Sequence, residues 1–135
     1  MQKPFNEGQK ADLMRIIDSE KPYLRDNVRR RRIEIALKLE LSTHDLDRLS
    51  KECYGKPFTD LMYERRVKRA KQILADPRYQ EMKISEIAFD CGFGNLCDFN
   101  LYFKDLEEIS PTEYRAFHMN FRKVMGMSPT EYQTQ

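Results

Sequence analysis

The chain has 135 residues, of which 40% are hydrophobic and 34% charged, so it can bury one modest core or two small linked ones. No apolar run approaches the roughly 20 residues of a transmembrane helix, and no signal-peptide pattern opens the sequence. The three cysteines lack CxxC spacing, which argues against a disulfide framework or a zinc site and favours a reducing cytoplasm. The formal net charge is only +2, so composition alone does not indicate a nucleic-acid-binding protein.

Helical periodicity dominates the first half of the sequence, and β-branched alternation is nearly absent. A first helix is expected over residues 7–19, ended by Lys21-Pro22, and a second over residues 30–39. After a turn at Glu40-Leu41 a third helix begins with Ser42 as its N-cap, because a serine oxygen accepts from the unpaired amides of a first turn. The residues predicted to face inward are Leu13, Ile16 and Ile17, then Ile33, Ala36 and Leu37 with Ile35 as a further candidate, then Leu46, Leu49 and Cys53.

The second half of the chain repeats this arrangement after a long linker helix. Gly55 is expected to close the third helix in a left-handed conformation, and a long helix then covers residues 59–75 until Asp76-Pro77 stops it. A short helix over residues 85–91, a turn at Gly92 and a helix over residues 96–106 follow. The last of these is expected to bury Phe99, Tyr102 and Phe103. The chain is therefore predicted to be all-α.

Two segments share the pattern of a helix-turn-helix. Each has a small alanine where two helices can cross closely, and apolar residues on both sides of a sharp turn. In this motif the first helix braces the second, whose outer face enters a major groove. Any helical hairpin shares part of the pattern, so periodicity alone leaves a helical bundle without DNA binding as the alternative. The matching residues are Ile35, Ala36, Leu39 and Leu41 in one segment and Ile87, Ala88, Cys91, Gly92 and Phe93 in the other.

Longer stretches of the chain resemble the AraC/XylS family of bacterial transcription regulators. The stretch LSTHDLDRLSKECYGKPFTDLMYERRVKRA, beginning at Leu41, resembles the family's first recognition helix, glycine turn and linker helix. The stretch ISEIAFDCGFGNLCDFNLYF, beginning at Ile84, and SPTEYR at residues 110–115 resemble its second unit and closing motif. The resemblance implies sequence-specific binding of double-stranded DNA by two recognition helices in successive major grooves, roughly 34 Å apart.

The resemblance also implies a domain organisation. It predicts an N-terminal helix and lead-in at 1–28, a first helix-turn-helix at 29–57, a linker helix at 58–76, a second helix-turn-helix with its closing helix at 83–115, and a duplicated closing segment at 116–135. EKPYL at residues 20–24 resembles the segment before this domain in sensor-regulators of the Bacteroides kind. This likeness implies that a sensing or membrane-anchored part lies outside the chain.

Carrying the family's DNA contacts over by position assigns functions to the two recognition helices. Arg48 is the leading base contact, because a guanidinium fits guanine O6 and N7, and Asn100 suits adenine. Ser42 and Lys51 are better placed for phosphates, which position a protein without reading sequence. The full set of implied DNA contacts is Thr43, His44, Asp47, Arg48 and Lys51 with Ser42 in the first unit, and Asn95, Leu96, Cys97, Asn100 and Lys104 in the second.

Four residues depart from the family pattern. Arg31 and Arg32 replace a capping Thr or Ser and an apolar residue, which makes them candidates for phosphate contact but leaves the helix start without its usual cap. Glu40 replaces a Gly or Asn and is strained if the turn needs positive φ. Leu101 replaces the usual arginine of the second recognition helix, so base reading by the second unit is in doubt.

An internal repeat is a further departure. Phe103-Lys104 followed by SPTEY at residues 110–114 recurs 18 residues later as Phe121-Arg122 followed by SPTEY at residues 128–132. The second copy has Gly126 where the first has Glu108, and glycine is the better residue for a left-handed turn. One closing helix is therefore surplus: it packs over the bundle, mediates dimer contact or competes for the same groove.

Other functions are weighed against DNA binding. Two basic blocks, at 29–32 and 65–71, are read as solvated helix faces unless other features place them beside DNA. A helical protein-protein interaction module that has lost specific DNA reading is the main alternative, and a small-molecule-responsive module is a third for which no pocket-forming set of residues is evident. His44 has no metal-ligand partners at suitable spacing, and no enzyme, cofactor or metal is expected. The expected partners are double-stranded DNA and, beyond it, RNA polymerase or a second copy of the chain, with no membrane contact.

Overall fold

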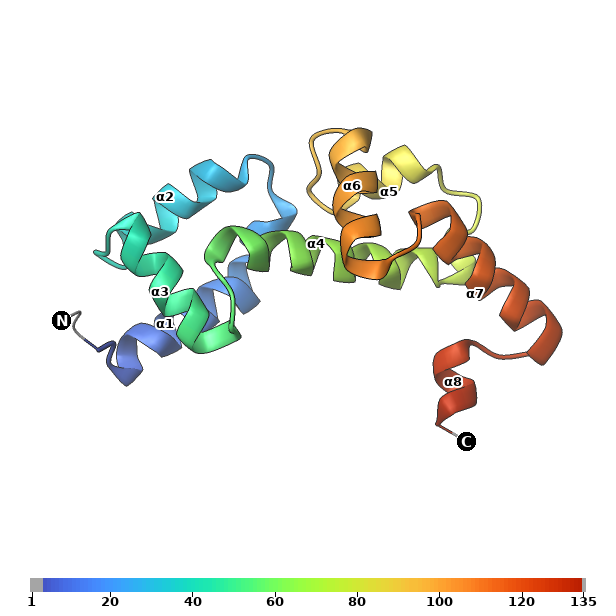
Figure 1. Ribbon diagram of the computed structural model, residues 1–135, viewed down its shortest axis with the longest axis horizontal. Coiled ribbons are helices and arrows are strands. Elements are labelled where there is room, and N and C mark those ends of the chain that lie inside the picture. Colours follow the sequence, from blue (N-terminus) through green and yellow to red (C-terminus); the bar gives the residue numbers. More distant parts are fainter. Residues whose placement is uncertain (1–3, 135) are drawn as a thin grey trace. The chain divides into compact units, whose positions relative to one another are not determined.

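The computed structural model describes residues 4–134, which form eight α-helices and two short 3-10 segments with no strand among them (Figure 1). The all-α prediction is confirmed. Residues 1–3 of the predicted lead-in and residue 135 of the duplicated segment lie outside the described part. The helices are α1 (Glu7–Glu20), α2 (Val28–Lys38), α3 (Thr43–Tyr54), α4 (Phe58–Leu74), α5 (Ile84–Asp90), α6 (Leu96–Glu107), α7 (Pro111–Met125) and α8 (Pro129–Gln133), with 3-10 segments at Pro22–Leu24 and Pro77–Tyr79.

The chain divides into two compact units, residues 1–65 and 66–135, and the boundary lies inside α4. Each unit therefore uses one part of α4 as a wall of its own core. Among the described residues, none of the helices combines the length and the apolarity that a bilayer-spanning segment needs.

The core of the first unit forms where α1, α2 and α3 pack on the start of α4. The inward faces predicted for the first and third helices are largely confirmed, although Cys53 is only half-buried. Ser50 is fully buried instead, and its hydroxyl donates to the carbonyl of Lys56 at 2.7 Å. The core residues are Leu13, Ile16, Ile17, Val28, Ile35, Ala36, Leu46, Leu49, Phe58, Leu61 and Met62.

The inner face of α2 differs from the prediction. Ile33 is 48% exposed and Leu37 72% exposed, whereas Ile35 is buried. The helix begins at Val28, two residues earlier than predicted, and its buried stripe runs from there at helical spacing through Arg31 to Ile35 and Ala36. The expected loss of the N-cap is also corrected, because the Asn27 side chain accepts from the amide of Arg30 at 3.1 Å.

The core of the second unit forms where α5, α6 and α7 pack with the rest of α4. It is rich in aromatic rings: Phe93 lies edge-on to Phe99 at 5.2 Å between ring centroids, and Phe99 to Phe103 at 5.8 Å. Phe99 and Phe103 are fully buried as predicted, whereas Tyr102 is half-buried.

The 18-residue sequence repeat is also a structural repeat. Phe103 and Tyr114 meet edge-to-face at 5.5 Å, and their counterparts Phe121 and Tyr132 do the same at 5.7 Å. Ser110 and Ser128 cap α7 and α8 with nearly the same backbone angles. The first copy thus packs against the second helix-turn-helix, and the second copy adds α8 to α7.

Candidate nucleic-acid interface

The turns of the two helix-turn-helix segments have matching hydrogen bonds. The amide of Leu41 donates to the backbone carbonyl of Ala36 at 2.9 Å, and the amide of Phe93 donates to the backbone carbonyl of Ala88 at 3.0 Å. One residue earlier, Glu40 and Gly92 are left-handed, at φ 57° and 93°. This is the Schellman ending of a helix, with an apolar residue just after the left-handed one. Glu40 has the positive φ that is costly for a non-glycine residue, and both turns have the form that aims a recognition helix.

Both recognition helices begin with a side-chain cap. The Ser42 hydroxyl accepts from the amide of Asp45 at 3.0 Å, and the Asn95 carbonyl oxygen accepts from the amide of Asp98 at 2.7 Å. Ser42 can still donate its own proton to a phosphate, because a hydroxyl accepts and donates at once. The Asn95 side chain makes a second hydrogen bond within the protein, since its amide nitrogen also donates to the Asp98 carboxylate at 3.3 Å. Asn95 thus caps α6, and the DNA contact predicted for it stays a prediction.

Asp47 does not lie on the outer face of α3. Its carboxylate accepts from Arg32 Nη2 at 2.6 Å and Nε at 3.3 Å, and from the amide of Phe58 at 3.3 Å. This carboxylate thus ties α2, α3 and the start of α4 together, and the hydrogen bond to Asp47 is the main cause that raises the pKa of Arg32. The base contact predicted for Asp47 and the phosphate contact predicted for Arg32 both require this ion pair to open.

Arg31 is likewise not available to phosphate, because its side chain is buried on the inner stripe of α2. Its Nη1 lies 3.1 Å from a Glu34 carboxylate oxygen, although without the alignment of a hydrogen bond. The preceding residues of the same basic block, Arg29 and Arg30, are exposed. The helical period counted from Val28 is the signal that separates the two pairs, and a helix predicted to begin at residue 30 lacks it.

Arg48 is held against the N-terminal lead-in. Its Nη1 pairs with the Asp45 carboxylate at 2.8 Å, and its guanidinium lies 4.7 Å from the centre of the Phe5 ring. Its side chain is 21% exposed. The exposed residues of the outer face of α3 are His44 and Lys51, and Thr43 is half-buried. Arg48 can reach a base only by leaving Asp45 and Phe5, so His44 and Lys51 are the more accessible of the predicted contacts.

The outer face of α6 is more apolar than that of α3. Cys97, Asn100 and Lys104 are exposed, together with Leu96 at 42% and Leu101 at 64%. On the inner side Arg66 of α4 is buried, with its guanidinium 5.3 Å from the centre of the Phe93 ring. The basic block at 65–71 is thus partly internal, and its exposed members are Lys68 and Arg69.

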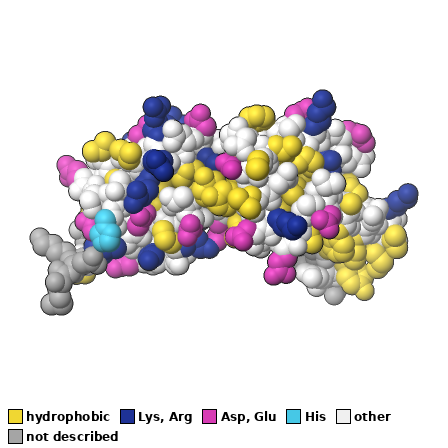
Figure 2. Space-filling view, turned by 45° about the horizontal axis from the view of Figure 1, so that its top comes forward, with side chains coloured by type: hydrophobic (Ala, Val, Ile, Leu, Met, Phe, Trp, Pro, Cys, Tyr) yellow, Lys and Arg dark blue, Asp and Glu magenta, His cyan; other side chains and the backbone are white. Residues whose placement is uncertain are grey.

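Charge is mixed on the face of the protein that Figure 2 draws. On the face drawn in Figure 2, Lys and Arg side chains are interspersed with Asp and Glu. Groups of three or more His, Cys, Asp and Glu residues able to hold a metal ion do not occur within residues 4–134. Phosphate attraction therefore has to come from particular side chains and helix starts, since no broad basic area covers this face.

The arrangement of these elements matches known proteins. A family model described as a helix-turn-helix domain matches residues 35–116. The structure is similar to the C-terminal domain of the two-component response regulator yesN from Fusobacterium nucleatum, with 30% identity over 81% of this chain and 99% of that chain and a TM-score of 0.67. It is also similar to an AraC-type DNA-binding-domain transcriptional regulator from Chromobacterium violaceum, with 29% identity over 63% of this chain and 73% of that chain and a TM-score of 0.54.

A DNA-binding transcriptional dual regulator from Escherichia coli K-12 shares the fold, with 21% identity over 84% of this chain and 98% of that chain and a TM-score of 0.60. The comparison with curated protein sequences gave no match. The family model covers more than half of the chain, and the matched residues run from the last part of α2 through α3 to α6 and into α7. The chain belongs to the AraC-type helix-turn-helix family.

Proposed function

We propose that the chain is a sequence-specific DNA-binding module of a transcription regulator, with α3 and α6 as its recognition helices. The observation that carries this proposal is the pair of matching turns, each followed by a capped helix whose outer side chains remain exposed. A helix of this kind fits the major groove, and its first amides attract phosphate. The remaining features of the proposal are a cytoplasmic site of action and the absence of catalysis.

The two helices are proposed to contribute unequally. On α3, His44 and Thr43 supply polar contacts to bases and Lys51 supplies a phosphate contact, with Arg29 and Arg30 of α2 as further phosphate contacts. On α6, Asn100 is the base-reading residue, Lys104 the phosphate contact, and Leu96 and Cys97 fit thymine methyl groups. The first unit is therefore expected to supply more affinity and the second a narrower preference.

A second candidate function is a protein-protein interaction module, and exposed apolar side chains favour it. Leu37 of α2 is 72% exposed and Phe89 of α5 63% exposed, and each stands one residue after the alanine of its segment. RNA polymerase or a second copy of the chain are the proposed occupants of such surfaces. This function predicts partner binding that survives removal of His44 and Asn100.

Selection of bound duplexes from a random pool at physiological salt tests the DNA-binding proposal. We expect an enriched sequence with two separate half-sites, one altered by His44→Ala and the other by Asn100→Ala. Lys123→Gln serves as a control, because Lys123 is an exposed cation of α7 outside both recognition helices. Recovery of a single half-site would show that α6 only contacts the backbone. Failure to enrich any sequence would overturn the proposal in favour of the interaction module.

A further inference from the structure

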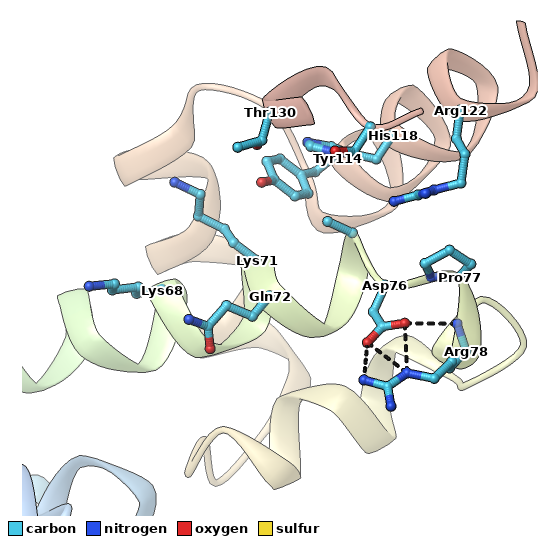
Figure 3. Close-up of a pocket in the computed structure, with 12 residues that line it drawn as sticks. Lys68, Lys71, Gln72, Asp76, Pro77, Arg78, Tyr114, His118, Arg122 and Thr130 are labelled. Atoms are coloured by element: carbon cyan, nitrogen blue, oxygen red, sulfur yellow. Dashed lines mark hydrogen bonds and ion pairs between the residues drawn. The ribbon is translucent and has the colours of Figure 1, made fainter. Parts of the chain in front are cut away.

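A hollow of about 590 Å³ lies within the second unit, between the end of α4, the 3-10 segment after it, α7 and the start of α8 (Figure 3). No residue of α6 lines it, so it is separate from the outer face of the recognition helix. Its lining residues range from Lys68 to Thr130 along the chain. No pocket-forming set is evident in the sequence, because these residues are brought together only by the packing of α7 and α8.

Cations dominate the lining of this hollow. Lys68, Lys71, Arg78 and Arg122 face it, and Asp76 is its carboxylate. Asp76 is already taken by Arg78, whose Nη2 donates to it at 2.7 Å. Arg122 pairs only loosely with Glu131 at 3.8 Å, whereas Lys71 pairs with Glu107 at 2.7 Å. Lys68 has no ion-pair partner among the described residues, so positive charge exceeds what the neighbouring carboxylates neutralise.

His118 forms part of the wall that Figure 3 shows opposite Lys68 and Lys71. Its side chain is buried, with 9% of the residue exposed, and its ring stacks on Tyr114 at 4.4 Å between centroids. Its Nδ1 is enclosed and has no hydrogen-bond partner, and the same holds for Nε of Arg122 one helical turn later. Buried nitrogens in proteins nearly always have partners, and a ligand with acceptor oxygens in the adjoining hollow is one way to supply them.

We propose that this hollow, the α4–α7–α8 pocket, binds a small dianionic oxyanion, of the class of phosphate monoesters and sulfate. Arg122 and Lys68 supply the charge, since guanidinium and ammonium groups are the usual partners of such anions. Arg122, Ser128 and Thr130 all come from the second copy of the closing motif. The duplicated segment, which lies beyond the residues that the family model matches, therefore completes the pocket.

Sulfate is a suitable probe, because it stays a dianion from pH 5 to pH 8, and the chain contains just two histidines, His44 and His118. The measurement is the carbon-bound ring-proton resonance of each histidine in a sulfate titration, with chloride at equal ionic strength as the reference. We expect a saturable shift at His118 and none at His44, which lies in the other unit. Equal shifts at both histidines, or the same shifts with chloride, would mean an adventitious ion only and would overturn the proposal.

The pH dependence of this binding has a defined sign. Burial, followed by the charges of Arg122 and Lys71, lowers the pKa of His118 in the ligand-free pocket. The other charged or titratable groups that line the pocket are Tyr114, Lys68, Asp76 and Arg78. Glu107 and Glu131 are the ion-pair partners of Lys71 and Arg122. A bound dianion raises the pKa of His118, so sulfate affinity should increase as the pH falls through that raised value toward the lower pKa of the ligand-free pocket. Affinity that stays constant across this range would contradict the placement of the anion beside His118.

Two variants at neighbouring positions distinguish binding in the pocket from nonspecific attraction of sulfate to surface charge. Arg122→Gln should weaken sulfate binding at His118 at least ten-fold, while Lys123→Gln, an exposed cation outside the lining, should leave it unchanged. If Arg122→Gln fails to fold, Lys68→Gln replaces it, because Lys68 is exposed and its loss disturbs no core contact. Similar affinity in all variants would overturn the proposal. Displacement of sulfate from His118 by a short duplex would also overturn it, because the pocket would then belong to the DNA interface.

Discussion

Single side chains decide how the first recognition helix is held. The carboxylate of Asp47 joins Arg32 of α2 to the first amide of α4, and both partners of the ion pair are about three-quarters buried, at 28% and 27% exposed. A charged hydrogen bond with this degree of burial contributes more than a surface pair. The angle between α2 and α3 thus depends on a residue that the sequence analysis assigned to base reading.

Replacing Asp47 by asparagine tests this reassignment. Asp47→Asn should lower the free energy of unfolding of the first unit by about 1–2 kcal/mol, because a charged acceptor of several donors is lost. The base preference of the folded variant should remain that of the parent. Urea denaturation and duplex selection measure the two effects, and Asp105→Asn on the exposed side of α6 is the control. Unchanged stability with an altered base preference would restore Asp47 as a DNA contact.

The cysteines provide a second test at the scale of single residues. Cys97 is exposed on α6, whereas burial raises the pKa of the Cys91 thiol to about 12. A thiol reagent should therefore modify Cys97 first and leave Cys91 intact in the folded protein, because the thiolate is the reactive form. A bound duplex should slow modification of Cys97 at least ten-fold, as measured by mass spectrometry. Equal modification rates at Cys97 with and without duplex would show that α6 does not enter the major groove.

At the scale of elements, the local signals of the sequence located both ends of α3, although they missed the Asn27 cap of α2. Ser42 as the cap of α3 and the left-handed Gly55 at its end are both confirmed, because these residue types satisfy the orphan groups of a helix locally. The buried face of α2 was wrong. Its buried stripe includes Arg31, one of four consecutive arginines, and the sequence pattern does not mark an arginine as buried. The burial of Arg31 comes from tertiary packing and not from its own polarity.

The two closing turns give a prediction for whole elements. Glu108 and Gly126 both end a helix in the left-handed region, at φ 69° and 73°. Glu108→Gly should raise the free energy of unfolding of the second unit by about 0.5–1 kcal/mol, because glycine adopts positive φ without steric cost. Gly126→Glu should lower it by a similar amount, and conformation alone would be the cause, since a Cβ at Gly126 meets nothing within 4 Å.

Chemical denaturation followed by far-ultraviolet circular dichroism measures these differences. Glu108→Ala is the matched control, because it removes the same charge but retains a Cβ. If alanine stabilised the unit as much as glycine, the effect of Glu108 would lie in its charge and not in its backbone conformation.

At the scale of the whole molecule, DNA binding depends on where the charged residues lie, because the chain has 24 basic residues and 22 acidic ones. Buried or paired arginines such as Arg31, Arg32 and Arg66 contribute to the fold, and exposed cations such as Arg29, Arg30 and Lys51 remain for phosphate. The sequence predicted the repeated helix-turn-helix because periodicity and turn residues are local. It did not predict the α4–α7–α8 pocket, which needs residues from both ends of the second unit to meet.

The central claim is that this nearly neutral chain binds duplex DNA through α3 and α6, and the most direct measurement is the equilibrium affinity for a selected duplex over a series of salt concentrations. The logarithm of affinity should fall linearly with the logarithm of salt, and Lys51→Gln should reduce the slope by about 0.9, the value for one released phosphate contact. Lys123→Gln should leave the slope unchanged. A slope near zero, or equal slopes for the parent and Lys51→Gln, would contradict a DNA interface on α3.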